Sequence, residues 1–368
     1  MKIVVVYATA GAGHKKAAQA IEVYLRSREP GAEIALVDVV DRSSWIFRLI
    51  YLWGYDFLIN HCQWMWALVF YASSRTSMRA FFNRITTGIH YYNTRPFTAY
   101  LTGMQPDVVV STHFLSSDIV SFLKQRGSLR ARLITVITDF GVHPFWLSPS
   151  TDYYCVASEA TRQILLAGGV PDVKIRVTGI PVDPKFLRIH DRQDICRRLG
   201  IDTSRPVVLV VTGSFGIGPI EEIARRLSND YEILAVCARN KRLYERLAAC
   251  GYPHTHIFGF VDYIDDLMAV ADVIVTKPGG LTISELLSMD LIPLFVAAIP
   301  GQESVNVGIL RRAGIGSRVD DLRGIGQQMA RCVQDASRLK GSIRAFKQTN
   351  AVSGIYDVIR TGSSGSAR

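Results

Sequence analysis

The sequence predicts an α/β protein made of two successive units, each with a parallel β-sheet flanked by helices. Short runs of buried-strand character alternate with helical patterns through most of the chain. A glycine-rich turn follows the first strand of each half, at 11–14 and at 213–218. Between the halves, residues 179–206 carry prolines and mixed charges. We therefore expect two Rossmann-like domains facing one another across a cleft, with ligands at the carboxyl ends of the strands.

The first half begins with an apolar run, continues through a helical pattern and later returns to strands. Residues 42–104 lack strand signals and are rich in aromatic residues, so helices and loops are expected there. The predicted strands are 2–8, 33–39, 107–111, 132–138, 153–157 and 173–178, and the predicted helices include 15–28, 116–126 and 158–168.

The second half repeats the alternation. Its predicted strands are 206–211, 231–237, 256–258, 272–276 and 292–297, separated by helices at 219–228, 241–250, 263–270 and 281–288. We assign an N-terminal domain to 1–180, a linker to 181–205 and a C-terminal domain to 206–340. A C-terminal helix at 341–360 and a flexible tail at 361–368 complete the division.

Composition narrows the class of partner. The net charge of +10 and the pI near 9.4 favour an anionic partner such as acidic lipid headgroups, nucleic acid or a phosphorylated substrate. The six cysteines form no Cys-x-x-Cys pair, so neither a zinc site nor a redox dithiol is indicated. No secretory signal and no run of about 18 apolar residues is apparent, which favours a cytoplasmic or peripheral protein.

The first glycine-rich turn carries a candidate base. Gly13 and His14 follow a predicted strand and open a helix, where backbone N–H groups favour an anion. The positive end of the helix disfavours the protonated form of His14, so a neutral imidazole could accept a proton from an attacking hydroxyl. A structural tight turn is the alternative interpretation. The loop lacks the spacing of a dinucleotide fingerprint and the lysine of a phosphate-binding P-loop.

Two turns in the second half suit a nucleotide diphosphate. Gly213 and Ser214 present backbone N–H groups and a hydroxyl after one strand. After another strand, Gly279, Gly280 and Thr282 could cradle phosphates while Glu285 reaches a ribose diol. The alternative is a capping box formed by Thr282 and Glu285. One unit later, Gln302 and Glu303 place an amide and a carboxylate that suit sugar hydroxyls.

These motifs, in this order, resemble GT-B glycosyltransferases that use UDP-sugars. The segment 136–146, Val-Ile-Thr-Asp-Phe-Gly-Val-His-Pro-Phe-Trp, resembles a block of diacylglycerol sugar transferases. The segments 177–182 and 277–280 resemble the processive diacylglycerol glucosyltransferases, and the family also includes the monogalactosyldiacylglycerol synthases. The likeness runs from residue 1 to about 358.

The resemblance implies an inverting transfer of glucose or galactose from a UDP-sugar to 1,2-diacylglycerol, without metal or cofactor. It implies that His14 or Asp139 is the base, that the diphosphate lies at 279–282 and that uracil lies near Phe260 and Val261. Gln302 and Glu303 would hold the donor sugar, and the acceptor would bind near Gly13, His14 and the segment from Asp139 through His143 to Trp146.

Aromatic and basic residues gather in 42–97 and favour docking on anionic lipid. They include Trp45, Trp53, Trp64 and Trp66, interleaved with Arg42, Arg48, Arg75, Arg79, Arg84 and Arg95. Trp45, Trp53, Arg48, His143 and Trp146 are therefore expected at the acceptor or membrane surface, on the cytoplasmic face. A buried helical insertion or a dimer contact is the alternative, and no nucleic-acid module is apparent.

Three other functions remain open. The chain could transfer sugar to a different lipid alcohol, such as a polyprenyl-linked or sterol-like one. It could be an enzyme similar to UDP-sugar 2-epimerases, which share two facing Rossmann domains, or a regulator that binds nucleotide without catalysis. The sequence does not decide between glucose and galactose, and it does not give the oligomeric state.

Overall fold

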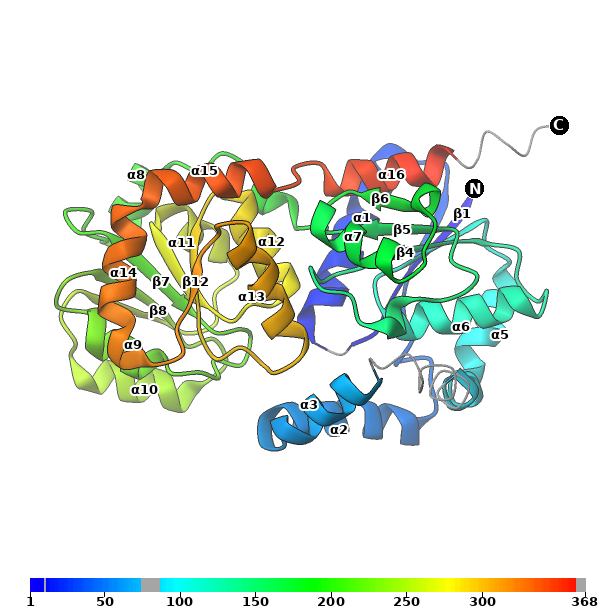
Figure 1. The fold of residues 1–368 in the computed structure, drawn as a ribbon, viewed down its shortest axis with the longest axis horizontal. Coiled ribbons are helices and arrows are strands. Elements are labelled where there is room, and N and C mark those ends of the chain that lie inside the picture. Colours follow the sequence, from blue (N-terminus) through cyan, green and yellow to red (C-terminus); the bar gives the residue numbers. More distant parts are fainter. Residues whose placement is uncertain (10, 74–86, 362–368) are drawn as a thin grey trace. The chain divides into compact units, whose positions relative to one another are not determined.

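The computed structural model describes residues 1–9, 11–73 and 87–361, which form two compact α/β units. Unit 1 contains residues 1–183, 299–305 and 348–368, and unit 2 contains residues 184–298 and 306–347. Each unit has one six-stranded sheet in which every strand pair is parallel (Figure 1). The α/β class with two successive parallel sheets is as the sequence predicts.

Unit 1 contains the sheet β2-β1-β3-β4-β5-β6. Its strands are β1 (Lys2–Tyr7), β2 (Glu33–Asp38), β3 (Val108–Ser111), β4 (Arg132–Val136), β5 (Tyr153–Val156) and β6 (Ile175–Val177). Its helices are α1 (Ala12–Arg28), α2 (Trp45–His61), α3 (Gln63–Ser73), α5 (Arg95–Met104), α6 (Phe114–Gln125), α7 (Glu159–Ala167) and α16 (Ala351–Thr361), with short 3₁₀ turns at η1 (Pro144–Trp146) and η2 (Asp172–Lys174).

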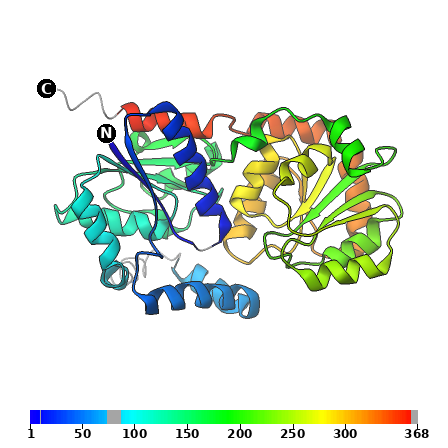
Figure 2. The same ribbon diagram turned by 180° about the vertical axis from the view of Figure 1, so that it is seen from behind.

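Alternating side chains of the central strands fill the two faces of this sheet. Ile3 and Val5 lie in the cluster that includes apolar residues of α1 and α16, whereas Val4 and Val6 lie in the cluster of α5 and α6. All four are fully buried. The view from behind shows α16 beside α1 on one face (Figure 2). Burial on both faces explains why β1 is a continuous apolar run.

Unit 2 contains the sheet β12-β11-β10-β7-β8-β9. Its strands are β7 (Val207–Val211), β8 (Glu232–Val236), β9 (Thr255–Phe258), β10 (Val273–Thr276), β11 (Ile292–Phe295) and β12 (Ser317–Arg318). Its helices are η3 (Pro184–Leu187), α8 (Arg192–Leu199), α9 (Ile220–Leu227), α10 (Lys241–Cys250), α11 (Ile264–Val270), α12 (Gly280–Ser288), α13 (Gln302–Arg312), η4 (Leu322–Gly324), α14 (Ile325–Gln334) and α15 (Ala336–Phe346). The first residues of α13 are grouped with unit 1.

The prediction of a single helix at 341–360 is wrong. Two helices, α15 and α16, occupy this part of the chain and are separated at 347–350. The backbone N–H of Lys347 closes the end of α15 on Ile343, and Lys347 itself is extended. The α15 helix is grouped with unit 2 and α16 with unit 1, so the break lies where the chain passes from one unit to the other.

The predicted helical region after β2 contains α2 and α3, which pack on one another outside the sheet layers of unit 1 (Figure 1). Among the described residues, no helix is both long enough and apolar enough to cross a membrane. Arg75, Arg79 and Arg84, the side chain of Trp66 and the predicted tail beyond Thr361 lie outside the described parts.

Candidate active site

In unit 1, the segments that follow β1 and β3 lie next to each other, because the strand order reverses between these two neighbouring strands. From β1 the chain goes to β2 on one side and later returns to β3 on the other. In parallel sheets, ligands bind outside the carboxyl ends of the strands at such a reversal. After β1, Gly13 and His14 lie in the first turn of α1, and after β3, Thr112 and His113 form the turn before α6.

His14 is held by the backbone of the second turn. Its Nδ1 atom lies 2.9 Å from the carbonyl oxygen of Thr112 and 2.8 Å from Oγ1 of Thr138, just after β4. The Thr112 hydroxyl in turn donates to the carbonyl oxygen of His14 at 3.0 Å. A carbonyl oxygen only accepts, so the proton of a neutral His14 lies on Nδ1. The lone pair is therefore on Nε2.

His14 is half-buried. Desolvation lowers the pKa of its imidazole to about 4, opposed by the hydrogen bond to Thr112, so the side chain is neutral at pH 7. The helix N-terminus was expected to keep His14 neutral, and in the structure desolvation is the largest cause of its lowered pKa. At neutral pH the side chain combines a fixed orientation with a lone pair on Nε2, which is what a general base requires.

Asp139 follows the same strand as Thr138 but makes a different contact. It is 4% exposed, and its carboxylate accepts a hydrogen bond from Nε2 of Gln302 within unit 1. Glu303 accepts from the backbone N–H of Ile299 at 2.8 Å, which closes the turn before α13. In this structure the sugar-binding candidates Gln302 and Glu303 therefore contact the protein itself.

Trp146 is not at the surface, contrary to the expectation that it faces a membrane. Its side chain is 4% exposed, and its ring lies 6.3 Å from that of His14. It packs in an apolar cluster with β5, β6 and α7. Trp146 therefore helps to keep water from His14.

His143 is half-buried and both of its ring nitrogens are engaged. Nε2 donates to the carbonyl oxygen of Phe70 at 3.2 Å, and Nδ1 accepts from the backbone N–H of Phe145 at 3.3 Å. Burial lowers the pKa of His143, opposed by the hydrogen bond to Phe70. The side chain thus joins α3 to η1.

Trp45, Trp53 and Arg48 lie on α2 with most of their side chains in solvent. The two tryptophans are 75% and 72% exposed, and Arg48 pairs with Asp41 at 3.1 Å. Other large apolar side chains on α2 and α3 are also exposed: Ile46, Leu49, Ile50, Trp64, Leu68 and Tyr71. We call these six residues together with Trp45 and Trp53 the aromatic face.

His113 is a site residue that was not predicted from the sequence. It is 1% exposed, its ring lies 4.6 Å from that of His14 in an edge-on arrangement, and it caps α6 by accepting from the N–H of Leu115. The sequence does contain a signal for this residue. An apolar strand ends in the polar triplet Ser111-Thr112-His113, and ligands bind at the carboxyl ends of such strands.

Unit 2 has the same reversal, between β7 and β10. The turn after β7 contains Gly213, Ser214 and Gly216, and it leads into α9. A Cβ atom on Gly216 would lie 2.1 Å from the carbonyl oxygen of Cys237, so only glycine fits there. Nearby, the buried hydroxyl of Thr212 has no hydrogen-bond partner among the described residues. An unsatisfied buried donor beside a glycine-rich turn fits a site for an anionic ligand.

The turn after β10 opens α12. Gly279 is its N-cap and Gly280 its first residue, so the capping-box interpretation of Thr282 and Glu285 is wrong. The N-cap Gly279 has no side chain to cap α12, and the N–H groups at the start of a helix favour phosphate oxygens. Asn306 holds this turn by donating to the carbonyl oxygen of Pro278 at 3.1 Å. Glu285 lies one turn into the helix and is buried.

The turn after β9 carries the predicted uracil contacts. Phe260 is 63% exposed, and the guanidinium of Arg239 lies 5.5 Å from the centre of its ring. Val261 is half-buried. Because β9 adjoins β8 and β8 adjoins β7, this turn lies at the same edge of the sheet as the glycine-rich turn.

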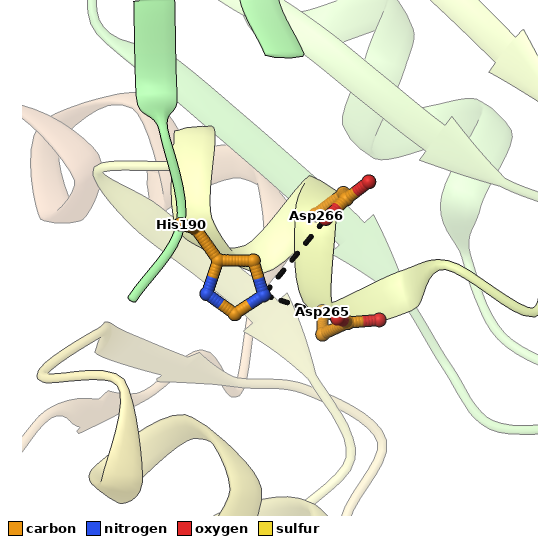
Figure 3. A group of neighbouring side chains, drawn as sticks. All are labelled: His190, Asp265 and Asp266. Carbon is orange, nitrogen blue, oxygen red and sulfur yellow. Dashed lines mark hydrogen bonds and ion pairs between the residues drawn. The ribbon is translucent and has the colours of Figure 1, made fainter. Parts of the chain in front are cut away.

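One group of side chains in unit 2 has donors suited to a metal ion: His190, Asp265 and Asp266 (Figure 3). Nε2 of His190 lies 3.0 Å from Asp265 and 3.8 Å from Asp266. Basic side chains already pair with both carboxylates, namely Lys185, Arg188 and Arg198. Burial raises the pKa of Asp265, but His190 and Lys185 outweigh it and hold the value below its usual range. Through these ion pairs, Lys185 of η3 and Arg198 of α8 hold their elements against α11, which carries Asp265 and Asp266.

Comparison with known proteins supports the resemblance. Residues 14–182 match the family model of monogalactosyldiacylglycerol synthase. The monogalactosyldiacylglycerol synthase 1 of Arabidopsis thaliana is 30% identical over 86% of this chain and 61% of its own length. The processive diacylglycerol β-glucosyltransferase of Staphylococcus epidermidis is 26% identical over 87% of this chain and 81% of its own. The chain spans 63% of the length of the spinach enzyme and 61% of that of the Arabidopsis enzyme.

Solved structures confirm the GT-B fold. MurG of Acinetobacter baumannii has a TM-score of 0.60 at 16% identity, covering 98% of this chain and 100% of that one. HepE of Anabaena in complex with UDP-glucose has a TM-score of 0.56 at 14% identity, covering 99% of this chain and 100% of that one. At these identities the likeness concerns the fold alone.

Proposed function

We propose that this chain, a relative of monogalactosyldiacylglycerol synthases and processive diacylglycerol glucosyltransferases, transfers a hexose from a UDP-sugar to the hydroxyl of 1,2-diacylglycerol. The observation that carries the proposal is the setting of His14. Thr112 and Thr138 fix its tautomer, and desolvation keeps it neutral, with the lone pair on Nε2. Deprotonating an alcohol needs such a base.

The chemistry is a single displacement with inversion. The diacylglycerol oxygen attacks the anomeric carbon while the bond from that carbon to the diphosphate oxygen breaks. The hydroxyl proton passes to Nε2 of His14, and the electron pair of the broken bond leaves with UDP. Asp139 is the rival base, but its carboxylate already accepts a hydrogen bond from Gln302.

The donor is proposed to bind the carboxyl edge of the unit 2 sheet. The uncapped N-terminus of α12 and the glycine-rich turn after β7 supply N–H groups that stabilise a leaving diphosphate. The unsatisfied hydroxyl of Thr212 is a further donor for it. We propose that these groups replace a metal ion, so that transfer persists when divalent cations are chelated.

The acceptor is proposed to arrive from a membrane on which the aromatic face rests. Exposed tryptophans are typical of the boundary between headgroups and acyl chains, and the net charge of +10 favours anionic lipid. A protein that uses a UDP-sugar and carries this face would work as a peripheral protein on the cytoplasmic leaflet.

The test is product analysis with vesicles that contain diacylglycerol and an anionic phospholipid. The purified protein is incubated with UDP-glucose and, in parallel, UDP-galactose, with and without a chelator. A glycolipid from one donor supports the proposal and identifies the sugar, and a ladder of larger products shows processive addition. UDP release without glycolipid would contradict diacylglycerol as acceptor, and conversion of the donor to an epimer would contradict transfer altogether.

A further inference from the structure

Helix α2 has two faces with different surroundings. Its exposed apolar residues, Trp45, Ile46, Leu49, Ile50 and Trp53, recur at the spacing of one helical face. Phe47 and Tyr51 lie one turn apart on the opposite side, where they pack against the core of unit 1. The helix that carries much of the aromatic face therefore also packs, through its other side, against the core of unit 1.

The inner face of α2 contacts the histidine beside the base. The hydroxyl of Tyr51 lies 3.4 Å from Nε2 of His113. Nδ1 of His113 accepts the N–H of Leu115, so the proton of a neutral His113 is on Nε2 and points to Tyr51. Both nitrogens of His113 are thus engaged, which fixes its ring.

The ring of His113 then limits where His14 can lie. The two rings meet edge to face, with centres 4.6 Å apart and planes at 82°. Among the described residues, the ring of His14 is hydrogen-bonded at Nδ1, so rotation about that anchor is restrained by the neighbouring rings of His113 and Trp146. A base loses efficiency when its lone pair moves away from the reacting proton.

We propose that His113 is a positioning residue for His14 and that Tyr51 holds His113, which makes α2 part of the machinery that orients the base. The inference rests on the proposed function for its effect on turnover. It goes beyond that function because it assigns a role in the reaction to a helix whose other side is exposed and apolar. The order of contacts is Tyr51 to His113 to His14, all within unit 1.

The variant His113→Asn separates positioning from folding. An asparagine at this N-cap can still accept the N–H of Leu115, so α6 keeps its cap, while the ring that touches His14 is gone. Tyr51→Phe removes one hydroxyl and keeps the ring that stacks on Phe47. Tyr91→Phe is the matched control, because Tyr91 is half-buried against the same core cluster and contacts Phe122 instead of a histidine.

We expect His113→Asn to lower kcat about tenfold, and Tyr51→Phe to lower it less, with the KM for the UDP-sugar unchanged. Because Tyr51 acts through His113, adding Tyr51→Phe to His113→Asn should cause no further loss. Tyr91→Phe should match the parent protein. Independent, multiplying losses in the double variant, or full kcat in His113→Asn, would overturn the inference.

Titration of His14 by NMR tests the same idea without any sugar transfer. The chain has eight histidines, so the His14 signal is assigned by its loss in His14→Gln. Among the described residues, His113 interacts electrostatically with both His14 and His90. In His113→Asn, water reaches the smaller side chain, and the pKa of His14 should rise from about 4 toward 6.5. An unchanged titration would overturn the inference, whereas absence of glycolipid from the parent protein would contradict only the proposed function.

Discussion

The Nδ1 atom of His14 lies 2.9 Å from the carbonyl oxygen of Thr112, across 98 residues of sequence. His14 lies in the first turn of α1, the helix after β1, and Thr112 directly follows β3, the neighbouring strand in the sheet. The contact exists because the strand order reverses there. It decides which nitrogen of His14 carries the proton and so which one can take a proton from a substrate.

Replacing His14 by Ala should lower kcat by about 10²- to 10⁴-fold, the usual contribution of a general base. UDP binding, measured by calorimetry, should survive, because the proposed donor site lies in unit 2. His254→Ala is the control, since His254 is an exposed histidine of unit 2. Near-parental turnover in His14→Ala would exclude it as the base.

The pH dependence of kcat/KM should reflect the lowered pKa of His14. The base works only when unprotonated, and its pKa is about 4, so kcat/KM should stay level from pH 7 to about 5 and fall below that. An ordinary histidine base would lose activity from about pH 6.5 downward. The unfolded chain binds the proton first, so the free energy of unfolding should also decrease as the pH falls from 6.5 toward 4. His14→Gln should reduce that decrease.

Thr138→Val should lower kcat by about three- to tenfold, as expected for one hydrogen bond. Valine keeps the shape but removes the Oγ1 atom that lies 2.8 Å from Nδ1 of His14. Thr102→Val, on the outer part of α5, removes a hydroxyl that bonds only to its own helix and should have no effect on kcat. Equal kcat in both variants would contradict a role for Thr138 in holding the base.

The variant Thr212→Val should bind UDP more weakly without being less stable to heat. The Thr212 hydroxyl is buried without a partner among the described residues, and such a group costs about 1–3 kcal/mol. Its removal should leave the thermal midpoint equal or higher while weakening UDP binding. Unchanged affinity for UDP would show that the hydroxyl does not reach the donor.

The glycines of the turn after β7 offer a matched comparison. At Gly213, φ is +95° and a Cβ would meet nothing within 4 Å, so alanine adds backbone strain only. At Gly216, φ is +60° and a Cβ would lie 2.1 Å from the Cys237 carbonyl oxygen, so alanine must also displace backbone. Gly216→Ala should therefore lower both the thermal midpoint and the UDP affinity more than Gly213→Ala. The reverse order would contradict the proposed donor turn.

The strands were predictable because burial on both faces makes them short, continuous apolar runs. Glycine-rich turns directly after such strands then placed Gly13, His14, Gly279 and Gly280 at the carboxyl edges of two parallel sheets. The charge of +10 and the clustered tryptophans of α2 were likewise visible in the sequence. The sequence by itself thus determined the fold class, the two units and the candidate base.

Only the tertiary structure decided what surrounds these residues. The strand order joins His14 to Thr112 and His113, and no local pattern encodes a contact across 98 residues. Trp146 resembled a surface aromatic in the sequence, but packing against β5, β6 and α7 buries it. The tautomer of His14, its lowered pKa and its link through His113 to Tyr51 depend on such packing, because each is set by neighbours that are distant in sequence.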